Sequence, residues 1–199
     1  MAVRLARELQ ELKNLPKDSL VGATPLNDQG THWKGWIKGP DGTVYDGGTF
    51  YIDIVVPEGY PFHPLMCKFL TKVWHPNVSS VTGYICLDIL KDEWTPSQTI
   101  HSVLLSLQLL LTSPNPDDPQ DGVVAEQCRR SWREYEEQAR QWTKMYASKS
   151  AEGPVAAPVF MYPEALDQMK GMGFSEADSK EALLKTKGNV QRAVGIITD

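Results

Sequence analysis

The chain has 199 residues, of which 41% are hydrophobic and 23% are charged, a composition that argues against a disordered or coiled-coil protein. At about 150 residues per domain, this length fits one full domain with a small appendage. Twenty Lys and Arg against 25 Asp and Glu leave a net charge of −5, which provides no bulk attraction to nucleic acid or to an anionic membrane.

Neither a membrane span nor a secretory signal is predicted. The longest apolar stretch, Val103–Leu111, is too short to cross a bilayer, and the amino-terminal residues carry several charges within their apolar pattern. We therefore expect a cytoplasmic protein, with the nucleus as a further location. The three cysteines, Cys67, Cys86 and Cys128, are too widely spaced to indicate a disulfide framework or a Cys-x-x-Cys metal site.

The chain opens with an amphipathic helix, because Leu5, Leu9 and Leu12 recur at helical spacing, and Pro16 ends the pattern. Apolar and polar residues then alternate over 33–37 and 50–56, which predicts two strands, and a third strand is expected over 66–71. No period is sustained over 74–99. A segment of that length without regular structure is often functional.

Helices return in the second half of the chain. A broad apolar face predicts a central helix over 100–111, capped by Ser97 or Thr99, and Asp121 is placed to cap the next helix. Aromatic and small residues at helical spacing predict a long helix over 132–146.

We divide the chain into a domain at 1–147, a linker at 148–159 and a second domain at 160–199. The linker residues are small, polar or proline and show no apolar period. The last 40 residues contain three short helical patterns. A core that small is marginal, which favours a binding module over a second catalytic unit.

Cys86 is the most unusual of the candidate reactive residues, since it lies in the irregular segment directly after Gly83-Tyr84-Ile85. Burial as a small hydrophobe and service as a nucleophile both remain open from this context. A cysteine thiolate attacks acyl centres without a dedicated base, so the lack of a neighbouring histidine does not exclude catalysis. Phosphate-binding glycine motifs are absent from the sequence, and its four histidines lack metal-ligand spacing.

Five motifs resemble the ubiquitin-conjugating enzymes in order and spacing. They are Tyr60-Pro61-Phe62, His75-Pro76-Asn77, the run from Cys86 to Leu90, Trp94-Thr95-Pro96, and Pro116-Asp117-Asp118-Pro119. The tail resembles a ubiquitin-associated (UBA) domain, with Met172-Gly173-Phe174 as its loop, and the pair resembles the 25-kDa type of conjugating enzyme. This resemblance implies an α+β fold: a four-stranded antiparallel meander sheet flanked by helices, followed by a three-helix UBA bundle.

The reaction implied by the resemblance places ubiquitin on Cys86 as a thioester and then transfers it to a lysine amine. Asn77 is the candidate donor to the oxyanion, with bracing of its own loop as the alternative role. Asp118 is expected to orient the incoming lysine and to favour loss of its proton, and Asp88 to help shape the acceptor site. Degradative polyubiquitin chains are the expected product.

The resemblance also implies the binding surfaces. The expected contacts with the activating enzyme and RING-type ligases are Arg4, Arg7, Lys13, Pro61, Phe62, Trp94 and Pro96, although Phe62 and Pro96 are equally compatible with core or turn positions. The expected ubiquitin contacts of the UBA domain are Met172, Gly173, Phe174, Ile196 and Ile197, where family members often have paired leucines in place of the isoleucines. Leu65 and Thr95 also depart from the family pattern, which leaves the choice of ligase open.

We expect a monomer that binds no nucleic acid, membrane, metal or cofactor, with ATP and magnesium consumed by the upstream activating enzyme. Two alternatives remain. One is a noncatalytic ubiquitin-binding adaptor that retains only the UBA domain's activity. The other is a cysteine hydrolase, for which a histidine base is required; His75 is nearest in sequence and has no evident orienting partner.

Overall fold

The computed structural model describes residues 1–148, 162–186 and 188–198. The chain divides into two compact units, Met1–Val155 and Ala156–Asp199. Apart from Ser148, the predicted linker lies outside the described residues. Within those residues, no helix combines the length and apolar character needed to cross a membrane.

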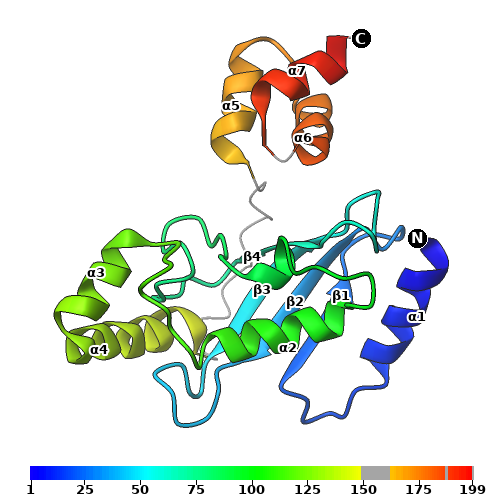
Figure 1. Ribbon diagram of the computed structural model, residues 1–199. Coiled ribbons are helices and arrows are strands. Elements are labelled where there is room, and N and C mark those ends of the chain that lie inside the picture. Colours follow the sequence, from blue (N-terminus) through cyan, green and yellow to red (C-terminus); the bar gives the residue numbers. More distant parts are fainter. Residues whose placement is uncertain (149–161, 187, 199) are drawn as a thin grey trace. The chain divides into compact units, whose positions relative to one another are not determined.

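The first unit is built on a four-stranded antiparallel sheet in which each strand pairs with its neighbour in sequence (Figure 1). Its strands are β1 (Val21–Pro25), β2 (His32–Lys38), β3 (Thr49–Val55) and β4 (Met66–Phe69). This is the meander implied by the resemblance. The sequence predicts strands that correspond to β2, β3 and β4 but none that corresponds to β1.

The remaining elements of this unit lie before and after the sheet in sequence. They are α1 (Ala2–Lys13), the 3-10 turn η1 (Asp88–Leu90), α2 (Ile100–Leu110), α3 (Gly122–Arg130), α4 (Trp132–Trp142) and the π-helical turn η2 (Thr143–Ala147). The long helix predicted over 132–146 is therefore regular only to Trp142 and continues as η2.

The hydrophobic core lies between one face of the sheet and α2, which crosses that face (Figure 1). The inward-facing residues of β2 and β3 are paired, with Gly35 opposite Ile52. A Cβ atom on Gly35 would lie 2.8 Å from Leu104 of α2 and 2.9 Å from Ile54. Glycine at this position therefore allows α2 to pack closely against the sheet.

Both predicted helix caps are present. Thr99, rather than Ser97, caps α2. Its side chain accepts a hydrogen bond from the Ser102 amide, and the Ser102 hydroxyl accepts one of 2.8 Å from the Thr99 amide. Asp121 caps α3 by accepting hydrogen bonds from the amides of Val123 and Val124. Caps of this kind satisfy amide groups that have no partner within the helix.

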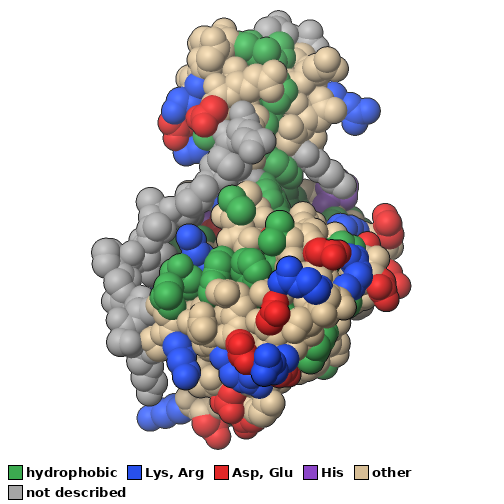
Figure 2. Space-filling view, turned by 90° about the vertical axis from the view of Figure 1, so that its left-hand side faces the viewer, with side chains coloured by type: hydrophobic (Ala, Val, Ile, Leu, Met, Phe, Trp, Pro, Cys, Tyr) green, Lys and Arg blue, Asp and Glu red, His purple; other side chains and the backbone are tan. Residues whose placement is uncertain are grey.

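Helices α3 and α4 carry ion pairs on their exposed surfaces, including Arg130–Glu134 and Arg140–Glu136. Figure 2 shows acidic and basic side chains interspersed over one face of the molecule. This face therefore presents no extended patch of a single sign.

The second unit contains three helices, α5 (Pro163–Gly171), α6 (Glu176–Lys185) and α7 (Val190–Thr198). They enclose a small core of Leu166, Met169, Ala182, Leu183 and Ala193. This is the three-helix bundle expected from the tail sequence.

Gly83 lies three residues before Cys86, at a position where only glycine fits without strain. Its φ is +78°, and a Cβ atom there would lie 2.0 Å from the carbonyl oxygen of Phe69; Gly42 has a similar φ of +73° but open space around it. We expect Gly42→Ala to lower the free energy of unfolding by about 1 kcal/mol through backbone strain, and Gly83→Ala by about 3 kcal/mol because the clash adds to that strain.

Urea titration followed by tryptophan fluorescence measures this difference, since all six tryptophans lie in the first unit. Equal losses in the two variants would mean that the backbone near Gly83 yields without cost.

Candidate functional site

Cys86 lies at the end of a short extended segment beside the sheet. Tyr84 bridges to Lys68 of β4, Ile85 bridges to Val78, and the Cys86 amide donates a hydrogen bond of 2.9 Å to the Asn77 carbonyl. Its position is therefore fixed by backbone contacts on both sides, while its side chain is partly exposed.

The two other cysteines are buried. Burial raises the pKa of Cys128 to about 11, and burial together with the Asp53 carboxylate raises the pKa of Cys67 further above its ordinary value. The thiolate is the nucleophilic form of cysteine. Cys86 is therefore the cysteine best suited to attack a substrate.

The segment His75-Pro76-Asn77 connects Cys86 to its surroundings. The Pro76 carbonyl accepts hydrogen bonds from the amides of Gln120 and Asp121, at 2.8 and 2.9 Å. The buried Asn77 side chain donates to the carbonyls of Asn115 and Asp118, both at 2.9 Å, and accepts from the Asn115 amide at 2.8 Å. These contacts place the loop 114–119 beside the segment that holds Cys86.

The Asn77 contacts match the bracing role considered for this residue. Both amide hydrogens of the side chain are engaged by carbonyl oxygens of the loop, so neither is directed at the Cys86 sulfur in this conformation. Donation to an oxyanion would require one of these hydrogen bonds to break.

His75 is buried, and its ring is not hydrogen-bonded to Cys86, as the base of a cysteine hydrolase would be. Its Nδ1 accepts a hydrogen bond from the Asn77 amide at 3.0 Å, so the neutral ring carries its hydrogen on Nε2 and donates to the Leu110 carbonyl at 3.1 Å. Both ring nitrogens are thus occupied by backbone groups. His75 does not serve as the base that a cysteine hydrolase requires.

Lys91 is a residue that the sequence reasoning missed. Its ammonium group donates a hydrogen bond to the Cys86 sulfur at 3.1 Å, across the single turn η1. That hydrogen bond, followed by the charges of Cys86, Asp118 and Asp88, raises the pKa of Lys91. The only sequence signal was a cation five residues after the cysteine, which no motif marks.

The structure therefore brings together the four residues predicted to carry the chemistry. Asp118 and Asp88 are exposed and lie close enough to Lys91 to raise its pKa. Asn77 is hydrogen-bonded to the loop that carries Asp118. The result is a surface site with a partly exposed sulfur, two carboxylates and an ammonium group.

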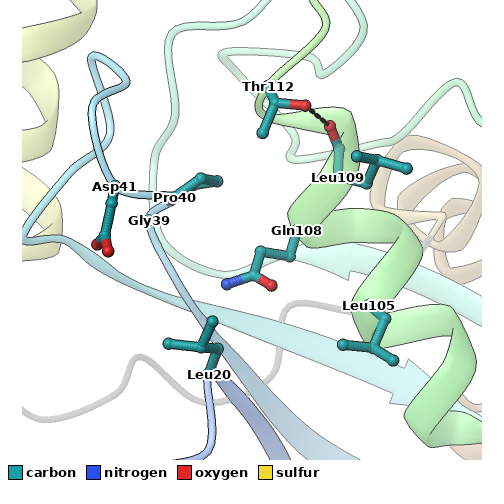
Figure 3. Close-up of a pocket in the computed structure, with 8 residues that line it drawn as sticks. All are labelled: Leu20, Gly39, Pro40, Asp41, Leu105, Gln108, Leu109 and Thr112. Carbon is teal, nitrogen blue, oxygen red and sulfur yellow. Dashed lines mark hydrogen bonds between the residues drawn. The ribbon is translucent and has the colours of Figure 1, made fainter.

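A separate pocket of about 380 Å³ lies between α2, the residue that precedes β1 and the turn that follows β2 (Figure 3). It is lined by Leu20, Gly39, Pro40, Asp41, Leu105, Gln108, Leu109 and Thr112. None of the predicted catalytic residues lines it. The Cys86 site is therefore distinct from this pocket.

Comparison with known proteins agrees with this geometry. Residues 4–143 match the family model described as ubiquitin-conjugating enzyme, and residues 161–197 match the UBA/TS-N domain. The chain belongs to the ubiquitin-conjugating enzymes.

Similar proteins extend over nearly the whole chain. It is 42% identical to ubiquitin-conjugating enzyme E2 27 of Arabidopsis thaliana, over 96% of this chain and 94% of that protein. It is 40% identical to human ubiquitin-conjugating enzyme E2 K, over 98% of this chain and 95% of that protein. The E2 domain of a Toxoplasma gondii conjugating enzyme superposes with a TM-score of 0.70 at 45% identity, covering 73% of this chain and 98% of that one.

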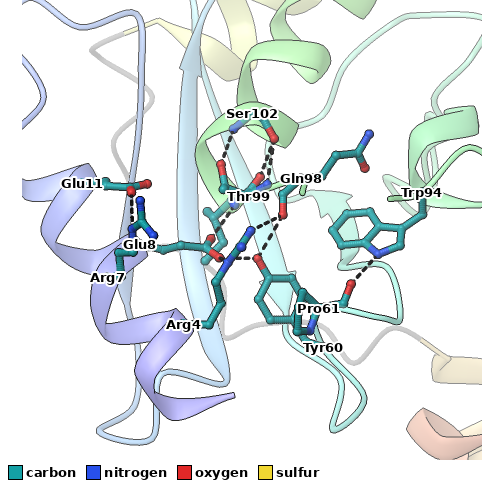
Figure 4. A network of polar contacts seen from close by, with 11 residues as sticks. Arg4, Arg7, Glu8, Glu11, Tyr60, Pro61, Trp94, Gln98, Thr99 and Ser102 are labelled. Atoms are coloured by element: carbon teal, nitrogen blue, oxygen red, sulfur yellow. Dashed lines mark hydrogen bonds and ion pairs between the residues drawn. The ribbon is translucent and has the colours of Figure 1, made fainter. Parts of the chain in front are cut away.

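Three of the enzyme's predicted partner-binding residues, Arg4, Pro61 and Trp94, lie where α1 adjoins the loops at 60–62 and 94–98 (Figure 4). The Trp94 indole donates a hydrogen bond of 2.8 Å to the Pro61 carbonyl, and Arg4 donates one of 2.8 Å to the Gln98 carbonyl. Phe62 is 77% exposed and Pro96 is exposed, so neither is a core residue. Arg7 pairs with Glu11 on the exposed side of α1, and Lys13 lies in its last turn.

Glu8 is the buried centre of this surface and was not among the predicted site residues. Its carboxylate accepts hydrogen bonds from Arg4, from the Tyr60 hydroxyl and from the amide of Ile100 at the start of α2 (Figure 4). Burial and the neighbouring carboxylate raise the pKa of Tyr60, which keeps its hydroxyl a donor. Glu8 is only 2% exposed, and these partners compensate for the cost of removing its carboxylate from water.

The predicted ubiquitin contacts of the UBA domain differ in exposure. Met172 and Ile196 are 55% and 48% exposed, and Gly173 is exposed with a φ of +93°. Phe174 and Ile197 are half-buried and pack against the core of the bundle. Met172 and Ile196 are therefore the freer apolar contacts, and the other two also support the fold.

His75 predicts a distinct pH dependence of stability. Burial lowers its pKa from the ordinary 6.5 to about 4, so the unfolded chain binds this proton more readily than the folded chain. The stability contributed by neutral His75 is complete above pH 6.5 and is lost as the pH falls towards 4, by about 3 kcal/mol.

Urea titrations across this range are expected to show a flatter pH dependence for His75→Gln than for the native sequence, although the variant is less stable at neutral pH. The exposed His63 offers a matched control, and His63→Gln is expected to keep the native slope. An unchanged slope in His75→Gln would assign the acid sensitivity to other groups.

Proposed function

We propose that Cys86 accepts ubiquitin from the activating enzyme as a thioester and transfers it to the amine of a lysine. The observation that carries this proposal is the partly exposed Cys86 sulfur, which accepts a hydrogen bond from the Lys91 ammonium, a group that the Asp118 carboxylate also influences. Membership of the conjugating enzymes supports ubiquitin transfer in general. The thioester and the residue roles are our proposals.

In the first step, the Cys86 thiolate attacks the carbonyl carbon of the ubiquitin thioester on the activating enzyme. A new C–S bond forms, the old C–S bond breaks, and the activating enzyme's thiolate leaves. Because one thioester replaces another, this exchange depends on placement of the thiolate more than on a strong acid or base. A surface sulfur without a histidine partner suits that requirement.

In the second step, the neutral lysine amine attacks the Cys86 thioester, an isopeptide C–N bond forms, and the C–S bond breaks. The attacking amine must first lose a proton, and the role proposed for the exposed Asp118 carboxylate is to orient the amine and accept that proton. The nitrogen loses a second proton as the amide forms, and this proton returns the departing Cys86 sulfur to the thiol. As the bond to sulfur breaks, negative charge develops on Cys86. The Lys91 ammonium, 3.1 Å from the sulfur, stabilises that charge.

The partner surface around Glu8 suggests how other proteins bind. Phe62 and Pro96 are exposed on the two loops that contact α1, which fits transient apolar contact with the activating enzyme and with RING-type ligases. We infer that the enzyme acts as a monomer, binds no cofactor of its own and relies on the activating enzyme for ATP and magnesium. The UBA domain would bind a second ubiquitin and support the building of degradative chains.

The charging reaction tests the first step. We expect the protein, incubated with ubiquitin, activating enzyme, ATP and magnesium, to form an adduct that survives a nonreducing gel and is released by added thiol. Cys86→Ala is expected to abolish the adduct, whereas Cys128→Ala keeps it because that thiol is buried. Mass spectrometry that located the bond on Cys67 or Cys128 would contradict the proposal.

The UBA domain is tested by ubiquitin binding without activating enzyme. Met172→Glu and Ile196→Glu are each expected to weaken binding about tenfold in calorimetric titrations of the full chain, because each removes an exposed apolar contact. Gln191→Glu serves as the control, since Gln191 is exposed on α7 and lies about 140° around the helix from Ile196. Equal weakening by the control would indicate a general effect of negative charge.

A further inference from the structure

The loop 114–119 carries Asp118 and has few backbone N–H groups that could form hydrogen bonds within the loop. Three of its six residues are prolines, which lack an N–H group. Its order therefore depends on groups supplied by the rest of the protein. From the interior, Asn77 binds the backbone of Asn115 and Asp118.

A second group reaches the loop from the outside. Arg129, near the end of α3, donates a hydrogen bond of 2.6 Å from Nη2 to the carbonyl of Pro116. Its Nη1 lies 3.4 Å from the Glu126 carboxylate, one turn earlier on the same helix. The guanidinium therefore binds one of the two carbonyls, those of Pro116 and Asp117, that lie between the two bound by Asn77.

Helix α3 is itself attached to the segment that holds Cys86. The Asp121 carboxylate, which caps α3, also accepts hydrogen bonds from the amide and hydroxyl of Ser80, at 2.8 and 2.6 Å. The Asp121 amide donates to the Pro76 carbonyl. Arg129 therefore extends from a helix whose start is fixed to the segment 76–80, which also holds the backbone of Ile85 and Cys86.

We propose that Arg129 is a positioning residue for lysine transfer. Through the Pro116 carbonyl it holds the loop so that the Asp118 carboxylate faces the approaching amine, while Asn77 holds the same loop from beneath. Arg129 touches neither the thioester nor the lysine. This role rests on the proposed function, because it acts only on the step in which an amine discharges the Cys86 thioester.

The structure provides a matched control for this role. Arg130 adjoins Arg129 on α3 and also pairs with a carboxylate on the exposed surface, but its hydrogen bond goes to Glu134 and not to the loop. Arg129→Met removes the donor and keeps much of the aliphatic stem. Arg130→Met removes an equivalent charge without touching the loop.

The experiment charges each full-length protein with ubiquitin and then follows single-turnover discharge onto free lysine over a range of lysine concentrations. Arg129→Met is expected to form the thioester at the native rate but to discharge it about fivefold more slowly at saturating lysine, since a charge-assisted hydrogen bond is lost. Arg129→Lys is expected to restore part of this rate. Arg130→Met is expected to behave like the native protein in both steps.

The decisive comparison uses Asp118→Asn. If Arg129 acts by placing the Asp118 carboxylate, Arg129→Met causes no further loss of discharge rate in the Asp118→Asn protein. An equal fivefold loss in both backgrounds, or no loss in either, would overturn the positioning role. A native protein that forms no thioester would overturn the proposed function and the role of Arg129 together.

Amide hydrogen exchange gives a readout that needs no ubiquitin. The Asn115 amide donates to the Asn77 side chain, and the Asp117 amide donates to the Asn115 side chain. We expect both amides to exchange faster in Arg129→Met than in Arg130→Met. Identical exchange in the two variants would show that Arg129 does not hold the loop and would overturn the proposal.

Discussion

The active-site region depends on the polar contacts of one tripeptide, His75-Pro76-Asn77. His75 joins it to the end of α2, Pro76 joins it to the start of α3, and Asn77 joins it to Cys86 and to the loop that carries Asp118. The segment is buried, so its polar groups lose their hydrogen bonds to water, and these contacts replace them. Four parts of the chain therefore share one reference point.

This arrangement separates the groups that hold the site from those that act in it. His75 and Asn77 are buried and fully hydrogen-bonded, whereas Asp88, Lys91 and Asp118 are exposed. An exposed ion pair contributes little to stability because water and salt screen it. The reactive side chains can thus be approached by another protein without loss of the framework beneath them.

Much of the fold follows from the sequence pattern, and its failures have identifiable causes. The apolar face of α2 and the alternation of β2 and β3 are strong signals because each buries one face. In β1 the alternation fails because only Val21 of its five residues is large and apolar. The end of α4 was missed because a π-helical turn keeps a similar aromatic spacing.

Cys86 and the neighbours to which a chemical role is assigned were identified through the family resemblance, but the contacts among them were not. The direction of the Asn77 amide depends on carbonyls 38 and 41 residues away, and the Lys91 contact depends on the single turn η1. Glu8 was missed for the same reason: on α1 it looks like one more surface charge. Its partners at Tyr60 and Ile100 lie 52 and 92 residues further along the chain.

Glu8 also links the partner surface to the rest of the enzyme. Its carboxylate lies at the amino-terminal end of α2, where the helix dipole favours negative charge, and it binds Arg4 and Tyr60 at the same time. The α1 helix, the loop at Tyr60 and the start of α2 are therefore held by one buried group. A partner that binds the exposed Phe62 and Pro96 meets a surface already ordered before contact, so little conformational entropy is lost on binding. A small, transient interface can then be specific, which is what an enzyme requires if it must release one partner before it meets the next.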